Sequence, residues 1–316
     1  MENFLFSLNA TMPVFLVIVL GWVLMQLKLF NKEFLSVADK YVFKVALPML
    51  LFRDIAATNL KEGFQLKFVL FCMAATTVMF LGIWGLATLF MKDKSMVGAF
   101  TQAAARGSAA VLGIAFVENI YGNFGMAPLM IVSAVPLFNI YSVIILTLCS
   151  QNNNAGSKKE VIKRAFFNVL KNPIIIGIVL GVPFSLFGIQ LPVILSKTVS
   201  NVAGTATPIA LLVVGANFEG RRAFAKLKPT LIASLIKLLI IPAVFFPFAV
   251  SMGFRGSELV AILVMLGSPT TVTCYIMAKN MGNDAELSSS IVVMATLLSS
   301  VTLTFWIFLL KTLAFI

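Results

Sequence analysis

The stretch Leu266-Gly267-Ser268-Pro269-Thr270-Thr271-Val272-Thr273 decides how this chain folds. It lies inside an apolar run, residues 257–281, that is long enough to cross a lipid bilayer. Proline has no backbone N–H and clashes with the preceding helical turn, so a helix through this run should break here. A break at this depth leaves polar backbone groups that only protein or a water-filled cavity can satisfy. The stretch therefore predicts either a packing kink or a functional site.

A second stretch of the same kind favours the functional site. Residues 102–110, Gln-Ala-Ala-Ala-Arg-Gly-Ser-Ala-Ala, interrupt another apolar run about 161 residues earlier. The two predicted breaks lie at about 106–110 and at 267–271.

Composition places the chain among polytopic helical membrane proteins. Its 316 residues are 60% hydrophobic and the mean hydropathy is +1.01. The net charge of +12 comes from Lys and Arg in short loops, which orient a membrane protein, and does not indicate nucleic-acid binding. Histidine is absent and Cys72, Cys149 and Cys274 lie in apolar runs, so no metal site or disulfide is expected. The sequence contains no nucleotide-binding loop and no catalytic Ser/His or Asp/Asp pair, so we expect neither an enzyme, an ATP-driven pump nor a cofactor.

Ten apolar segments of about 20 residues predict an all-α protein with ten transmembrane helices. The segments are 8–27, 37–53, 66–90, 96–121, 127–149, 173–189, 195–217, 229–252, 257–281 and 287–313. A polar linker, 150–172, separates a first group of five (1–149) from a second (173–316). With the N-terminus outside, fourteen Lys and Arg face the cytoplasm and six face the other side, so both termini should be outside and the linker cytoplasmic.

The two halves match each other at an offset of 160 residues. Pro13 pairs with Pro173, Pro48 with Pro208, and the run 18–21 with 178–181, both Ile-Val-Leu-Gly. Because each half has an odd number of spans, two copies must lie in opposite orientations, which is the inverted-repeat plan of secondary transporters. The broken spans four and nine would then meet near the bilayer midplane. There, helix ends of opposite partial charge would face one cavity suited to a charged solute.

Arg106 is the strongest candidate for contact with that solute. An arginine inside an apolar span is costly unless it is paired or hydrated, and its fork of donors suits a carboxylate. The alternative is permanent pairing with backbone carbonyls at the broken helix. Lys237, about nine residues past Lys228 in span eight, is expected to extend its ammonium to the cytoplasmic interface rather than to act in the cavity. Asn139 could coordinate substrate or bond between helices.

Two sets of candidate residues follow. The substrate-binding candidates are Arg106, Gly107, Ser108, Asn139, Gly267, Ser268, Pro269, Thr270 and Thr271. The coupling-ion candidates are the carboxylates Glu118, Asp54 and Asp39, although the position of Glu118 favours a solvated helix end over a protonatable group. Pro48 and Pro208 are expected to kink spans two and seven.

The sequence resembles the auxin efflux carrier family, in its prokaryotic, malonate-transporter-like branch. The resemblance covers nearly the whole chain and rests on 46–52 (Ala-Leu-Pro-Met-Leu-Leu-Phe), 135–141 (Val-Pro-Leu-Phe-Asn-Ile-Tyr), 206–212 (Ala-Thr-Pro-Ile-Ala-Leu-Leu), 235–242 and Gly267-Ser-Pro269. It implies ten helices in two inverted repeats, with a scaffold and a transport domain that hold an organic anion where the broken helices cross. It also implies elevator-type alternation and frequent homodimers.

Two departures from the family pattern affect these expectations. Ser108 and Ala115 stand where the family commonly has Asn and Pro, which leaves open whether the first crossover is fully broken. The long loop of the plant exporters is missing, so plant auxin is a poor guess for the substrate.

We therefore expect a secondary transporter of mono- or dicarboxylates such as malonate in the bacterial cytoplasmic membrane. A passive facilitator or channel, or a sodium-coupled symporter, is the alternative. The choice between H⁺ and Na⁺ as coupling ion stays open, as do the substrate itself and the direction of transport.

Overall fold

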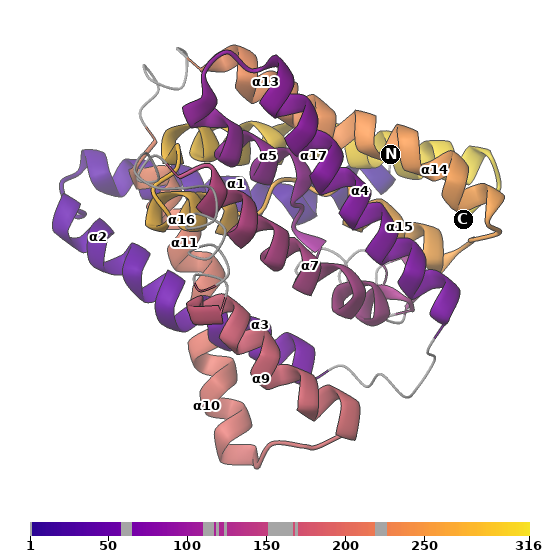
Figure 1. The fold of residues 1–316 in the computed structure, drawn as a ribbon, viewed down its shortest axis with the longest axis horizontal. Helices are drawn as coiled ribbons and strands as arrows, with labels where there is room; N and C mark the ends of the chain where they lie inside the picture. Colours follow the sequence, from indigo (N-terminus) through magenta and orange to yellow (C-terminus); the bar gives the residue numbers. More distant parts are fainter. Residues whose placement is uncertain are drawn as a thin grey trace.

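The computed structural model describes residues 2–57, 65–109, 117, 120–122, 125–150, 167, 170–218 and 226–316. Within these ranges the regular elements are helices, together with one isolated antiparallel bridge between Gly107 and Thr270. Figure 1 shows the arrangement of the helices along the chain.

The described residues of the first half form six α-helices and two irregular turns. They are α1 (Glu2–Gln26), α2 (Lys32–Tyr41), the π-helical turn η1 (Val42–Ala46), α3 (Leu47–Ala56), α4 (Leu66–Phe90), the 3₁₀ turn η2 (Lys94–Met96), α5 (Val97–Ala105) and α7 (Ala127–Leu148).

In the described residues, the second half begins at α9 and ends with α17, the longest helix among them. Its elements are α9 (Pro173–Phe187), α10 (Val193–Gly204), α11 (Ala206–Ala216), α13 (Leu227–Leu235), the π-helical turn η4 (Ile236–Ile240), α14 (Ile241–Ser251), α15 (Ser257–Gly267), α16 (Thr273–Asn280) and α17 (Ala285–Thr312).

Several of these helices are long and apolar enough to cross a membrane. In the described part of the chain they are Leu66–Phe90, Ala127–Leu148, Val193–Ala216, Leu227–Ser251 and Ala285–Thr312. Shorter apolar helices lie at Phe15–Gln26, Pro173–Phe187 and Ser257–Gly267. The described part of the chain is thus all-helical and has the character of a multi-pass membrane protein, while the number of ten spans stays a prediction.

Helix bounds recur along the chain at the spacing that the sequence repeats suggest. The bounds of α4, Leu66–Phe90, return 161 residues later as the continuous stretch Leu227–Ser251. Likewise, the short helix α5, which starts at Val97, corresponds to α15, which starts at Ser257. This recurrence supports the predicted duplication, which stays a prediction.

Close glycine contacts join the same helices in a reciprocal way. The helix α1 packs on α11, and α3 packs on α9. A Cβ on Gly21 would overlap the carbonyl of Leu212, and a Cβ on Gly181 would lie 3.0 Å from the carbonyl oxygen of Phe52. Gly181 and Leu212 follow Gly21 and Phe52 by 160 residues. One contact therefore occurs twice with the halves exchanged, as an inverted duplication would produce.

The helices pack as two groups. One contains α1, α2–α3, α9 and α10–α11, and Figure 1 shows α3, α9 and α10 together at one end of the molecule. The other contains α4, α5, α7, α13–α14, α15–α16 and α17, and α17 also packs on α1.

Prolines lie beside the irregular turns in these helices. Pro48 follows η1, Pro242 follows η4, and Pro208 comes after the interruption at Thr205 between α10 and α11. Since Pro242 has no N–H, it cannot bond the carbonyl of Leu238 four residues earlier. The indole Nε1–H of Trp306 donates to that carbonyl instead, at 2.9 Å.

Candidate functional site

Both predicted helix breaks are present. The helix α15 ends at Gly267, Ser268 is extended (φ −69°, ψ 153°), and α16 begins at Thr273. The helix α5 ends at Ala105, and Arg106 is also extended (φ −85°, ψ 117°). The first crossover is therefore interrupted even though Ser108 replaces the usual Asn. Ala115 lies outside the described residues.

The two breaks cross and satisfy each other's backbone. The backbone N–H of Ser108 donates to the carbonyl of Pro269 at 2.9 Å, beside the bridge between Gly107 and Thr270. The hydroxyl of Thr270 donates to the carbonyl of Ala103 at 2.7 Å. Polar backbone that would be unpaired in hydrocarbon is thus paired within the crossing.

The position of Lys237 contradicts the prediction that its ammonium reaches the cytoplasmic interface. The side chain is fully buried, and its Nζ donates to the carbonyls of Ala105 (3.1 Å), Met265 (3.2 Å) and Leu266 (2.8 Å). These carbonyls belong to the last turns of α5 and α15, where the partial charge of each helix is negative. Lys237 therefore caps both interrupted helices inside the protein.

Arg106 is also buried, but it has no carboxylate partner in the described part of the chain. The residue is 4% exposed, and its Nη1 donates to the thioether of Met277 in α16 at 3.0 Å. Its predicted alternative role, permanent pairing with carbonyls at the break, is taken by Lys237. A thioether is a weak acceptor, so most of the guanidinium's five donors are available to another group.

A cavity of about 50 Å³ lies beside this guanidinium. It is lined by Leu47, Leu50, Leu51, Asp54, Arg106, Gly107, Ser108, Ala109, Val135, Phe138, Thr207, Thr271 and Thr273. Thr273 lies where α16 begins after the second break, so this end of α16 brings positive partial charge to the wall of the cavity. The opposite wall comes from α3 and α11, and both groups of helices therefore contribute to the cavity.

The cavity gathers some of the predicted substrate residues and excludes others. Arg106, Gly107, Ser108 and Thr271 line it. The remaining break residues, Gly267, Ser268, Pro269 and Thr270, belong to the crossing but not to the lining. Asn139 is fully buried within α7, and its amide donates to the carbonyl of Val135 at 2.9 Å. It neither lines the cavity nor donates to another helix.

The coupling-ion candidates separate in space. Asp54 lines the cavity and pairs with Arg53 at 2.8 Å. Asp39 lies elsewhere, in an ion pair that joins α2 to Lys279 of α16. Glu118 lies outside the described residues.

Thr207 is a lining residue that the sequence did not single out. It stands in Ala206-Thr207-Pro208, and the residue 160 positions earlier is Leu47, which also lines the cavity. The 160-residue offset therefore relates two lining positions to each other, and this relation is the sequence signal that could have pointed to Thr207.

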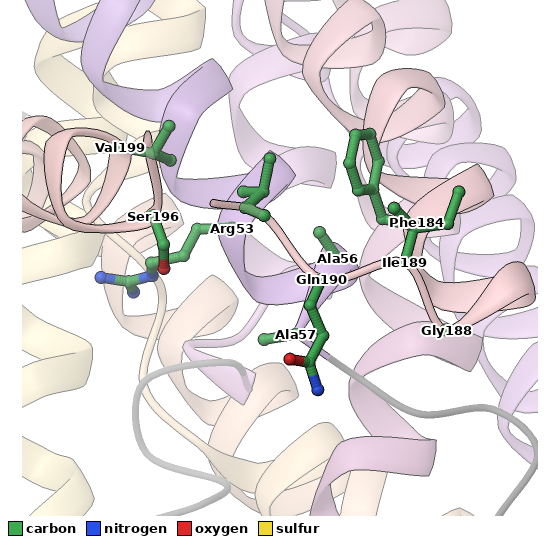
Figure 2. Close-up of a pocket in the computed structure, with 10 residues that line it drawn as sticks. Arg53, Ala56, Ala57, Phe184, Gly188, Ile189, Gln190, Ser196 and Val199 are labelled. Carbon is green, nitrogen blue, oxygen red and sulfur yellow. The ribbon is translucent and has the colours of Figure 1, made fainter. Parts of the chain in front are cut away.

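A larger cavity of about 340 Å³ is lined by Arg53, the residue that precedes Asp54 in the chain. Figure 2 shows Arg53, Gln190 and Ser196 among its polar lining residues, where the end of α3 meets α9 and α10. Because Arg53 lines this cavity and Asp54 lines the small one, their ion pair stands between the two.

Known proteins resemble the chain along nearly its whole length. The model of a family described as membrane transport protein matches residues 6–307. A protein of Methanothermobacter thermautotrophicus named "Uncharacterized transporter" is 25% identical over 305 residues, which cover 96% of this chain and 98% of the relative. A Rhizobium meliloti protein named "Putative malonate transporter" is 23% identical over 306 residues, which cover 95% and 94%.

Proposed function

Because the chain belongs to the membrane transport protein family, in agreement with its resemblance to auxin efflux carriers, we propose that it is a secondary active transporter of small organic anions. The family and the relatives are transporters, not enzymes. The proposed substrates are mono- or dicarboxylates such as malonate, the solute in the name of the Rhizobium meliloti relative.

The observation that carries this proposal is the buried Arg106 without a carboxylate partner in the described part of the chain. A buried guanidinium is costly unless an anion or water compensates its charge. Its free donors and the beginning of α16 border the same cavity. A substrate carboxylate there would supply the missing negative charge through charge-assisted hydrogen bonds.

The size of the cavity favours alternating access over an open pore. A volume of about 50 Å³ is well below the several hundred Å³ of usual ligand pockets. We therefore infer that binding requires the walls to separate, and these walls come from the two helix groups. An elevator-type movement of the group containing α5 and α16 against the group containing α3 and α11 would open the site to each side in turn.

We also propose a membrane, a topology, an assembly and a coupling ion for the protein. We place it in the bacterial cytoplasmic membrane with both termini outside, ten spans in two inverted repeats, and a homodimer as its assembly. The coupling ion is H⁺ or Na⁺, and Asp54 is the candidate for H⁺ because it lines the anion cavity.

Uptake into proteoliposomes tests the proposal. Radiolabelled malonate and a panel of other carboxylates are offered under separately imposed proton, sodium and voltage gradients. Saturable uptake by the wild type should be lost in Arg106→Gln and strongly reduced in Arg106→Lys, which keeps the charge but not the fork of donors. Arg255→Gln, which changes an exposed arginine outside the cavity, is the matched control.

Two outcomes would count against the proposal. Unchanged uptake in Arg106→Gln would remove the anion contact, and no carboxylate uptake by folded protein under any gradient would remove the substrate class. Flux that never runs uphill under any gradient would favour the passive facilitator.

A further inference from the structure

The three carbonyls around Lys237 form an oxygen cluster of the kind that binds a monovalent cation. They come from the C-terminal ends of two interrupted helices, Ala105 in α5 and Met265 and Leu266 in α15. In transporters with broken helices, the carbonyls of unwound backbone and the C-terminal ends of half-helices coordinate the coupling ion, Na⁺ or H⁺. Here the ammonium of Lys237 uses its three N–H donors on these oxygens and occupies that position.

A fourth oxygen stands near the same point without a partner. The hydroxyl of Ser268 is fully buried and has no hydrogen-bond partner. A Cβ on Gly107 would meet this hydroxyl and would also lie 2.9 Å from Lys237 Nζ. A side chain at position 107 would therefore have to displace the ammonium or the hydroxyl. Without the ammonium, three carbonyls and one hydroxyl would face one buried space.

We propose that Lys237 is a built-in substitute for a coupling cation, which fills the carbonyl cluster where α5 and α15 end and makes anion binding at Arg106 independent of sodium. The inference rests on the proposed function, because coupling has a meaning only in a transporter. It divides the crossing by charge. The helix ends with negative partial charge hold a fixed cation, and the beginning of α16, which has positive partial charge, borders the solute cavity.

The fixed cation also distinguishes the chain from a sodium symporter of similar plan. In such a symporter the cation would enter and leave with each cycle. A covalently attached ammonium stays with the protein, so this cluster contributes no sodium to the stoichiometry. Any coupling ion must then act elsewhere, and Asp54 is the carboxylate that lines the solute cavity.

Thermal unfolding of the purified protein tests this inference without any substrate. The wild type should unfold at the same temperature in sodium, methylammonium and choline chloride of equal ionic strength. Lys237→Ala should unfold at a lower temperature in choline, and sodium or methylammonium should raise it by several degrees in a saturable way, because a ligand that binds only the folded state stabilises it. Lys237→Met, whose thioether chain fills the space, should be destabilised without a response to either ion.

The matched control is Lys228→Ala, which removes an exposed lysine from the start of the same span. It should behave as the wild type in all three salts. The inference is overturned if Lys237→Ala responds to sodium and methylammonium no more than to choline. It is also overturned if sodium stabilises the wild type saturably, and this second measurement decides the matter if Lys237→Ala does not fold.

Transport measurements distinguish a failure of this inference from a failure of the proposed function. If carboxylate uptake is observed, it should run equally in sodium and choline for the wild type and become about tenfold faster in sodium for Lys237→Ala, within the usual range of coupling between two sites. If no carboxylate is transported but Lys237→Ala is rescued thermally by cations, the cation substitute stands and the proposed substrate class fails.

Discussion

At the scale of single residues, Thr270 shows how one hydroxyl joins the interrupted helices. A continuous helix through α5 would bond the carbonyl of Ala103 to the N–H of residue 107, but the chain turns away after Ala105. The Thr270 hydroxyl takes that place from the other break, at 2.7 Å. The crossing is therefore held by side-chain hydrogen bonds as well as by its backbone bridge.

Replacing Thr270 with the isosteric valine should cost about 1–3 kcal/mol of folding free energy, because it leaves a buried carbonyl without a donor. Thermal unfolding in detergent measures the effect. Thr198→Val is the control, since the exposed Thr198 bonds only the carbonyl of Ile194 within its own helix. Equal unfolding temperatures for the two variants would contradict the role given to Thr270.

Asp54 places a negative charge beside an anion site. Its carboxylate lines the same cavity as Arg106, so an ionised Asp54 opposes an incoming carboxylate. Asp54→Asn should lower the concentration of malonate needed for half-maximal uptake about fivefold or more at neutral pH. It should also remove stimulation by an inward proton gradient. A variant with unchanged half-saturation would exclude Asp54 from the site.

At the scale of elements, helix pairs without room for a side chain hold the first helix group together. Gly215 of α11 faces the carbonyl of Ile18 in α1, just as Gly21 of α1 faces Leu212. A Cβ at either position would overlap backbone, which cannot move aside as a flexible side chain can.

Gly215→Val or Gly21→Val should therefore prevent α1 and α11 from packing, and little folded protein should be recovered from membranes. Size-exclusion chromatography in mild detergent measures the yield. In α4, a Cβ on Gly85 would meet nothing within 4 Å, so Gly85→Ala should be neutral or stabilise by up to about 1 kcal/mol. A normal yield of Gly215→Val would show that α1 and α11 lie further apart.

Local sequence signals are enough to predict the two breaks and most of the helix bounds. Apolar length predicts a span such as 66–90, and Gly-Ser-Pro at 267–269 predicts the break, where α15 ends at Gly267. The role of Lys237 could not be read in this way. Its carbonyl partners lie 28, 29 and 132 residues away along the chain, and depth in a span alone suggests only the nearest interface.

At the scale of the whole molecule, the Asp39–Lys279 ion pair links the two helix groups. Asp39 belongs to α2 and Lys279 to α16, which carries the second break. If α16 moves relative to α2 during transport, this link must open in every cycle.

A thiol crosslink between these positions tests the movement. In a cysteine-free background, Asp39→Cys with Lys279→Cys, joined by a short bifunctional reagent, should stop malonate uptake. The control joins Thr77→Cys to Tyr141→Cys, whose hydroxyls lie 3.0 Å apart on α4 and α7 within one group, and uptake should continue. Full uptake through the first crosslinked pair would argue against relative motion of the groups.

The bond from Trp306 to the carbonyl of Leu238 has a consequence for biosynthesis. The acceptor is made 68 residues before its donor, and two of the carbonyls that hold Lys237 are also made after the lysine. During insertion, the segment around η4 must therefore remain in the translocon or the bilayer with an open carbonyl and with a lysine that lacks two of its three carbonyl partners. Nascent chains stopped before α17 should consequently be recognised as unfinished, and quality-control proteases should remove them faster than the completed protein.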